Sequence, residues 1–466
     1  MGGPPRVALT PAVLVGLILI LLASSWIQFT TVRETHVLIP ASADAASYMS
    51  YAYNLRTKGV YSHDHTWESG HPSTPQADAI SPPGYPLFLV AFMGKAPGFA
   101  FVRRVEWAQA ILGVLNTLLV FLLAAHIVPP RIACIPALLA AITPHLSTIT
   151  TYVLTEPLFS VLLLLSAWTF VRAFQSTRLV PWVLAGTVFG LCCLVRPTLH
   201  AFLPGALLAV LAVRRWRPLL LPLSVAGLCW LALMLPWFVY QQSVPPDPAH
   251  PVLLRSTLYH GSFPDFMYQG QAASRGVPYH IDPHRDEAMD SYAGLRHVVG
   301  GRMAAEPLRY LRWYVLGKPR YFLSWDILEG RGDVFIYPVD ASPYLSRPSF
   351  LAIYSLMFTL HWPLMILGVA GACMAWWPRV WKEMPRRAQI GLRVVATTLL
   401  VAIVLNMIGA PYPRYGIPFW SFAYIMAVAL ATQIWRIIQF HRFKGRRNTC
   451  APERVAGISG RGGVEA

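Results

Sequence analysis

Four charged residues border long apolar segments of this 466-residue chain. Asp44 follows the first apolar segment, Glu156 begins a later one, and Arg196 and Arg414 lie in short turns between others. A carboxylate can take a proton from a hydroxyl or an amine. Arginines can hold a phosphate with two hydrogen bonds and stabilise it as it leaves. These residue types therefore indicate group transfer from a phosphorylated donor, such as a lipid-linked phosphosugar.

The segment Pro40–Ser62 carries Asp44 at the start of a short helical pattern. Tyr48, Tyr51 and Leu55 recur at spacings of three and four, which predicts that they share a helical face with Asp44. We expect Asp44 to be a catalytic acidic residue and Tyr48 to bind substrate.

A second aromatic candidate is Tyr85, in the rigid extended turn Ser81–Pro86. A third, Tyr415, directly follows Arg414 in the turn before the last apolar segment. We expect both tyrosines, together with Arg196 and Arg414, to bind substrate, and Glu156 to act beside Asp44.

Each charged candidate also has a purely structural interpretation. Asp44 could cap a helix, since its side chain can accept from a free amide of the first turn. Glu156 could interact with a helix dipole. Arg196 and Arg414 could bind lipid headgroups or backbone carbonyls. The coincidence of all four charges on one membrane face favours the functional interpretation.

Composition indicates an all-α, polytopic membrane protein. Hydrophobic residues make up 55% of the chain and charged residues only 13%, whereas soluble proteins carry about a quarter charged residues. The net charge of +17 resides mainly in short loops and the tail, which argues against nucleic-acid binding. The six cysteines form neither a disulfide framework nor a CxxC metal pair.

Apolar runs of roughly 20 residues predict about ten transmembrane helices. They are Leu9–Ile27, Val105–Ala125, Ile132–Ile149, Val153–Phe174, Leu179–Val195, Leu199–Val213, Leu219–Tyr240, Phe350–Trp377, Ile390–Ile408 and Ile417–Trp435. Residues 1–435 would form the membrane domain, followed by a basic, disordered cytoplasmic tail at 436–466.

The distribution of basic residues predicts the topology. Arginine and lysine fill alternate short loops and the tail, which places both termini in the cytoplasm. Two long loops, 30–104 and 241–349, are then extracytoplasmic. We expect both to carry short interfacial helices, among them Asp286–Val299 and Glu306–Val315, and the second loop to cover the site.

Two loop clusters, each mixing histidine and aspartate, could ligate a divalent metal, although we favour solvated polar loops as their explanation. They are His63, Asp64, His65 and His71, and His280, Asp282, His284 and Asp286. We expect no required cofactor, with a divalent metal left open. The chain has no P-loop, dinucleotide-binding glycine motif or HExxH.

An ordered set of short motifs resembles C-type (GT-C) membrane glycosyltransferases, in particular the group of protein O-mannosyltransferases and aminoarabinose transferases. The motifs are Ser42–Tyr48, Ala52–Leu55, Gly59–Ser62, Ser81–Pro86, Thr155–Phe159, Val195–Pro197, Leu235–Trp237 and Arg414–Pro418. The resemblance covers most of the membrane part, Leu9–Ala431.

The resemblance implies a sugar donor carried on polyprenyl phosphate, with Asp44 as base or key acidic residue. It implies that Glu156 lies near the acceptor or a metal. Several relatives have two adjacent acidic residues in the first loop, whereas Ala43 and Ala45 flank Asp44 here.

Together these observations predict an inverting glycosyltransferase of a bacterial inner membrane, whose acceptor is a protein, a lipid or a glycan. The alternatives are a transporter or flippase of a lipid-linked sugar, which would place charges at mid-span, and a non-catalytic membrane assembly factor.

Overall fold

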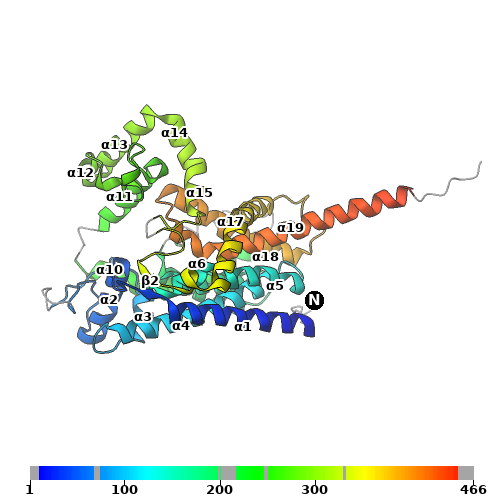
Figure 1. Ribbon diagram of the computed structural model, residues 1–466, viewed down its shortest axis with the longest axis horizontal. Coiled ribbons are helices and arrows are strands. Elements are labelled where there is room, and N and C mark those ends of the chain that lie inside the picture. Colours follow the sequence, from blue (N-terminus) through cyan, green and yellow to red (C-terminus); the bar gives the residue numbers. More distant parts are fainter. Residues whose placement is uncertain are drawn as a thin grey trace, which may run out of the picture.

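The computed structural model describes residues 10–67, 74–197, 200, 217–245, 250–328 and 332–449. Within them the chain is almost entirely helical, as predicted (Figure 1). The long helices are α1 (Pro11–Glu34), α4 (Phe99–Ala124), α7 (Glu156–Phe174), α8 (Val180–Val195), α10 (Leu220–Ser243), α17 (Pro348–Met374), α18 (Arg386–Ile408) and α19 (Pro413–Thr449).

Seven helices in the described ranges are long and apolar enough to cross a membrane: α1, α4, α7, α10, α17, α18 and the part of α19 up to Gln439. The bent pair α5 (Pro130–Ile142) and α6 (Pro144–Thr148), continued to Thr151, gives an eighth. The apolar helix α8 is shorter. The span expected at Leu199–Val213 lies outside the described residues, so a count of ten is not confirmed.

Proline determines where several helices begin and where one span breaks. Proline occupies the first or second position of α1, α5, α7, α8 and α17, where its missing amide costs nothing. Pro144 instead forces Thr143 into extended backbone. The span expected at Ile132–Ile149 is therefore broken, with a bend of 59° between its halves.

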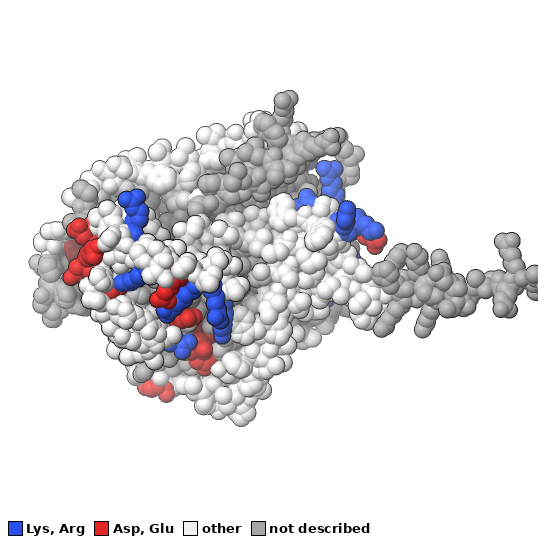
Figure 2. Space-filling model, turned by 90° about the horizontal axis from the view of Figure 1, so that it is seen from above, with Lys and Arg blue, Asp and Glu red and all other residues white. Residues whose placement is uncertain are grey.

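Successive spans alternate in direction, so the connecting segments gather at two ends of the bundle. We call the end that carries the described parts of 36–98 and 250–347 the loop end; the beginning of α1 lies at the opposite end (Figure 1). Charged side chains on the face shown in Figure 2 lie toward the two ends, with an uncharged band between them. Such a band is what a lipid-facing surface requires.

The first long loop forms α2 (Asp44–Lys58) and α3 (Gly84–Val90), and its short strand β1 (His36–Val37) pairs antiparallel with β2 (Val339–Ala341). His36 pairs with Ala341 and Val37 with Val339, with an irregularity between them. The two long loops are thereby joined directly at the base of α2.

The second long loop forms a small helical unit, which stands beside the loop end in Figure 1. It contains α11 (His250–Gly261), α12 (Arg285–Asp290), α13 (Tyr292–Ala305) and α14 (Pro307–Arg312). A π-helical turn (Trp313–Gly317) then leads to α15 (Lys318–Phe322) and α16 (Pro343–Ser346), which pack against the membrane helices. The helical unit has its own apolar core, which contains Tyr259, Phe263 and Leu295. The expected patches Asp286–Val299 and Glu306–Val315 are thus helical, although Ser291 divides the first.

The last helix differs from expectation in its length. We predicted a span ending at Trp435 and a disordered tail from 436, but α19 continues as a helix to Thr449. Up to Leu430 this helix is largely buried among its neighbours, with Trp420 and Tyr424 fully covered. This packing holds the first turn of α19, which carries Arg414 and Tyr415, in place.

Candidate active site

Asp44 and Arg414 meet at the loop end, from the starts of α2 and α19. Arg414 Nη2 donates a hydrogen bond of 2.5 Å to Asp44 Oδ2. The Asp44 side chain is 47% exposed, while that of Arg414 is 10% exposed. The carboxylate is therefore fixed through one oxygen and remains open to a substrate.

Glu156 lies on the buried side of Arg414 and is only 1% exposed. Its Oε1 accepts from Arg196 Nη2 at 2.6 Å and lies 3.2 Å from Arg414 Nε. Arg196 Nε also donates to Thr155 Oγ1 at 3.0 Å. One buried carboxylate thus orients two guanidiniums, and these charge-assisted contacts compensate its removal from water.

The Tyr415 ring faces both guanidiniums. Its centroid lies 4.6 Å from Cζ of Arg196 and 5.2 Å from Cζ of Arg414. Arg196 is also 5.4 Å from the Phe159 ring. Aromatic faces attract cations at these distances. Tyr415, predicted to bind substrate, is therefore placed to keep the two arginines together.

Tyr48 and Tyr85 form an aromatic wall beside the charges, with ring centroids 5.2 Å apart. Burial, followed by the Asp44 carboxylate, raises the pKa of Tyr48 far above its usual value. Burial likewise raises the pKa of Tyr85, with Glu156 adding to the effect. The Tyr85 hydroxyl donates to Gln109 Oε1 at 2.9 Å. Both tyrosines therefore remain neutral hydrogen-bonding groups at physiological pH.

Local backbone geometry positions Asp44 and Tyr85. Ala43, not Asp44, occupies the N-cap position of α2, and it has a φ of 48°, which is strained for a residue with a Cβ. Asp44 is the first residue of the helix, so the alternative interpretation of Asp44 as the N-cap does not hold. Gly84 permits close packing, because a Cβ there would lie 2.6 Å from the Leu194 carbonyl oxygen.

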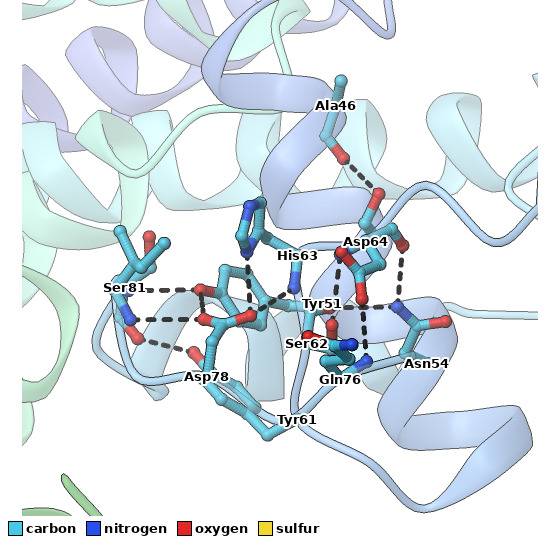
Figure 3. A network of polar contacts seen from close by, with 12 residues as sticks. Ala46, Tyr51, Asn54, Tyr61, Ser62, His63, Asp64, Gln76, Asp78 and Ser81 are labelled. Carbon is cyan, nitrogen blue, oxygen red and sulfur yellow. Dashed lines mark hydrogen bonds and ion pairs between the residues drawn. The ribbon is translucent and has the colours of Figure 1, made fainter. Parts of the chain in front are cut away.

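A polar network behind α2 holds the first loop in place (Figure 3). Asp78 accepts from the Tyr51 hydroxyl and, through Oδ2, from the His63 amide at 2.8 Å. The His63 ring nitrogen Nδ1 also lies 2.8 Å from Oδ2. Burial alone would raise the pKa of Asp78, but the hydrogen bonds from His63 and Tyr51 outweigh it and hold that pKa below its usual value.

This network separates residues that the helical spacing had grouped. Tyr48 lies near Asp44, as predicted, but Tyr51 turns to Asp78 and stacks on Tyr61, with ring centroids 4.3 Å apart. Tyr51 therefore supports the loop and does not line the site.

Tyr337 and Gln109 are site residues that the sequence analysis missed. Burial raises the pKa of Tyr337 to about 12, with the Arg414 cation opposing the shift and the Asp44 carboxylate adding to it. Gln109 Nε2 donates to the carbonyls of Thr150 and Tyr152 and so fixes Tyr85 from behind. The apolar residues around Tyr337, in an otherwise polar loop, could have indicated that this segment is buried.

The donor set does not fit a divalent metal. Guanidiniums of Arg414 and Arg196 occupy the cation positions beside Asp44 and Glu156. Across the described ranges, no three His, Cys, Asp or Glu side chains are grouped to hold a metal ion. Of the two predicted clusters, His63 is bonded to Asp78 and Asp282 to Arg302, while His71 lies outside the described residues. We therefore derive no step through a metal.

Comparison with known proteins shows which fold the chain shares. Residues 81–240 match the family model of dolichyl-phosphate-mannose-protein mannosyltransferase. The chain is similar in fold to the oligosaccharyltransferase AglB from Archaeoglobus fulgidus, with a TM-score of 0.52 and 15% identity over 95% of this chain and 52% of that one. The predicted resemblance to GT-C membrane glycosyltransferases is thereby confirmed for the fold.

A second solved structure, ArnT from Cupriavidus metallidurans bound to undecaprenyl phosphate, aligns with a TM-score of 0.40 and 14% identity, over 91% of this chain and 78% of that one. The chain spans about half of the length of the archaeal oligosaccharyltransferase. No curated protein matches.

Proposed function

We propose that the protein is a membrane glycosyltransferase that moves a sugar from polyprenyl phosphate to an acceptor. The observation that carries the proposal is the contact of Arg414 with both Asp44 and Glu156 at the loop end. It puts an accessible carboxylate beside two arginines, which are the groups needed to deprotonate an acceptor and to stabilise a departing phosphate. The partial family match and the GT-C fold support the same reaction class.

In the proposed reaction, the free oxygen of Asp44 takes the proton of an acceptor hydroxyl or amine. The acceptor atom forms a bond to the anomeric carbon while the bond from that carbon to the phosphate oxygen breaks, with inversion. Polyprenyl phosphate leaves carrying the additional negative charge. Arg414 and Arg196, both held by Glu156, bind that phosphate.

The aromatic residues complete the proposed site. Tyr48 and Tyr85 would contact the sugar or the acceptor through faces and hydroxyls, while Tyr415 keeps the arginines in position. Residues 241–349 would shape the acceptor side, because β2 and Tyr337 reach the base of α2.

We further propose that the loop end faces away from the cytoplasm, in a bacterial inner membrane. Helix direction supports this orientation, because the start of α5 with Arg131, the end of α7 with Arg172 and the loop with Arg379 lie at the opposite end, together with the beginning of α1. The donor would then be presented in the outer leaflet.

The two alternatives make different demands. A transporter of lipid-linked sugars would place charges along a path at mid-span, whereas Asp44, Glu156, Arg196 and Arg414 all lie at helix ends. An assembly factor would not require an accessible carboxylate ordered by an arginine.

The proposal is tested with purified protein in nanodiscs and a panel of radiolabelled polyprenyl-phosphate sugars. Label is followed into protein, lipid and glycan acceptor fractions, and released polyprenyl phosphate is measured in parallel. Release that depends on both donor and acceptor identifies the sugar. Tight binding of donors with neither release nor transfer across the whole panel would contradict the proposal and favour transport.

A further inference from the structure

A second charged pocket lies at the loop end, between the last turn of α1 and the first turns of α4. Its volume is about 440 Å³, within the range of about 300–1,000 Å³ that is usual for small-ligand sites. None of the residues that line it belongs to the candidate active site. They are Arg33, Glu34, Thr35, His36, Val37, Leu38, Pro40, Phe99, Val102, Arg103 and Glu106.

The pocket contains a buried carboxylate, Glu106, of which only one oxygen is hydrogen-bonded. Glu106 is 5% exposed, and its Oε2 accepts from Arg103 Nη1 at 2.7 Å. Its Oε1 makes no hydrogen bond to any residue that the structure describes. Oε1 therefore remains available as a hydrogen-bond acceptor on the lining of the pocket. A ligand carrying N–H donors and positive charge would satisfy it.

The same pocket offers guanidinium groups for an anion. Arg103 uses Nη1 for both Glu106 and the Val32 carbonyl, the latter at 2.8 Å. Arg33 bonds Glu34 through Nη2 at 2.8 Å and is 63% exposed. The remaining guanidinium nitrogens of these two arginines have no hydrogen-bond partner within the described ranges.

Two arginines and two glutamates line the pocket, and Glu34 also accepts from Arg347 at 2.5 Å. A lone anion would meet Glu34 and Glu106, and a lone cation would meet Arg33 and Arg103. Because Glu34 is already paired with Arg33 and Arg347, a ligand with one phosphate and one ammonium suits the two arginines of the lining and the Glu106 carboxylate. Charge complementarity therefore favours a zwitterion.

The surroundings of the pocket are those of a lipid. It lies where two membrane-spanning helices end, which is the depth of phospholipid headgroups. Phe99, at its edge, is 72% exposed, and Trp26 and Phe29 are exposed along the adjoining flank of α1. Aromatic side chains are enriched at this depth, and an apolar flank suits acyl chains.

We propose that this pocket binds a zwitterionic phospholipid with a primary ammonium, that is, a phosphoethanolamine headgroup. Arg33 and Arg103 hold the phosphate, and Glu106 accepts from the ammonium. A quaternary ammonium has no N–H to donate, so a phosphocholine headgroup satisfies Glu106 poorly. This proposal is independent of the sugar-transfer function.

The test measures lipid retention by native mass spectrometry. Delipidated protein is offered equimolar phosphatidylethanolamine, phosphatidylcholine and phosphatidylglycerol with identical acyl chains. We expect phosphatidylethanolamine to be retained about tenfold better than the other two, since one charge-assisted hydrogen bond differs. Glu106→Gln removes this preference and leaves phosphatidylcholine retention unchanged.

Glu306→Gln is the matched control. Glu306 also forms an i,i+3 ion pair with an arginine, Arg309, but on the exposed second loop. This variant keeps the preference. If Glu106→Gln proves too unstable, Arg33→Ala, at an exposed position, lowers retention of the phosphatidylethanolamine and phosphatidylcholine alike.

Three results overturn the proposal. They are equal retention of all three lipids by the wild type, unchanged retention in both Glu106→Gln and Arg33→Ala, and equally tight binding of soluble glycerophosphoethanolamine, which would mean that the acyl chains contribute nothing.

Discussion

Arg414 donates a hydrogen bond of 2.5 Å to Asp44, a residue 370 positions earlier in the chain. The same guanidinium lies 3.2 Å from Glu156 through its Nε. A single side chain therefore links the accessible carboxylate on α2 to the buried carboxylate on α7. The proposed reaction depends on this link, because it places the base and the phosphate-binding groups side by side.

Replacing Arg414 by alanine removes the contact with Asp44 and one of two cations facing the departing phosphate. We expect transfer to fall by about 10²- to 10³-fold, the usual cost of removing one electrostatic stabiliser. Arg414→Lys restores only part of the rate, because an ammonium cannot reach both carboxylates in the same geometry. Initial rates at saturating donor measure the effect. Arg309→Ala, an exposed arginine of the second loop, should retain full activity.

Glu156→Gln tests the buried carboxylate. The change keeps the size of the side chain but leaves the Arg196 charge without its carboxylate partner and Arg414 paired with Asp44 alone. We expect lower thermal stability, because removing one partner of a buried ion pair costs about 3–5 kcal/mol. Transfer should fall as well. Unchanged melting and unchanged rate would show that Glu156 does not hold the arginines.

Asp78→Asn tests the network behind α2. The pKa of Asp78 is held below its usual value, so the carboxylate stabilises the fold above the unfolded-state pKa of about 4. That stabilisation is lost as the pH falls through the lower, folded-state pKa. The wild-type first loop should become sensitive to protease in acid, whereas Asp78→Asn should already be sensitive at pH 7. Limited proteolysis from pH 3 to 7 measures both.

Lys318 is buried at the start of α15, where Nζ donates to the carbonyls of Met407 and Gly409, each at 2.8 Å. These contacts cap α18 just before Arg414. Burial lowers the pKa of Lys318 to about 7. The unfolded chain therefore binds more protons than the folded one between about pH 7 and 10, so this group makes stability rise with pH in that interval.

Lys318→Met removes both the capping contacts and the titrating group. We expect a lower melting temperature at every pH and a smaller rise between pH 7 and 9 than in the wild type. Thermal melts in one detergent at several pH values measure both quantities. Equal slopes for the two proteins would contradict the assignment of this pH dependence to Lys318.

The fold could be predicted largely from sequence, because apolar runs of membrane-spanning length are local signals. Candidate site residues were visible for a related reason: Asp44, Glu156, Arg196 and Arg414 are charges at the ends of such runs. The break at Pro144 was harder to predict, because a membrane helix often continues through a proline when neighbouring groups satisfy the freed carbonyl.

The pairing of these residues could not be predicted. Whether Arg414 contacts Asp44, Glu156 or both depends on how α2, α7 and α19 pack, which no local pattern encodes. The helical spacing places Tyr51 on the same face as Asp44, yet its hydroxyl donates a hydrogen bond to Asp78, which lies 27 residues further along the loop. Tyr337 belongs to a segment whose partner, the base of α2, is separated from it in sequence by the spans α4, α7 and α10.

The central claim is that Asp44 is the base of sugar transfer, and Asp44→Asn tests it most directly. Asparagine keeps the shape and can accept from Arg414, but it cannot take a proton. The matched control is Asp340→Asn, an exposed loop-end carboxylate paired with His36. Product formation and donor binding are measured for the wild type and both variants in nanodiscs with the same labelled donor.

We predict that Asp44→Asn binds the donor normally and transfers about 10²- to 10⁴-fold more slowly, the range expected for loss of a general base, whereas Asp340→Asn matches the wild type. Transfer by Asp44→Asn at the wild-type rate, with normal donor binding, would contradict the role of Asp44 as the base.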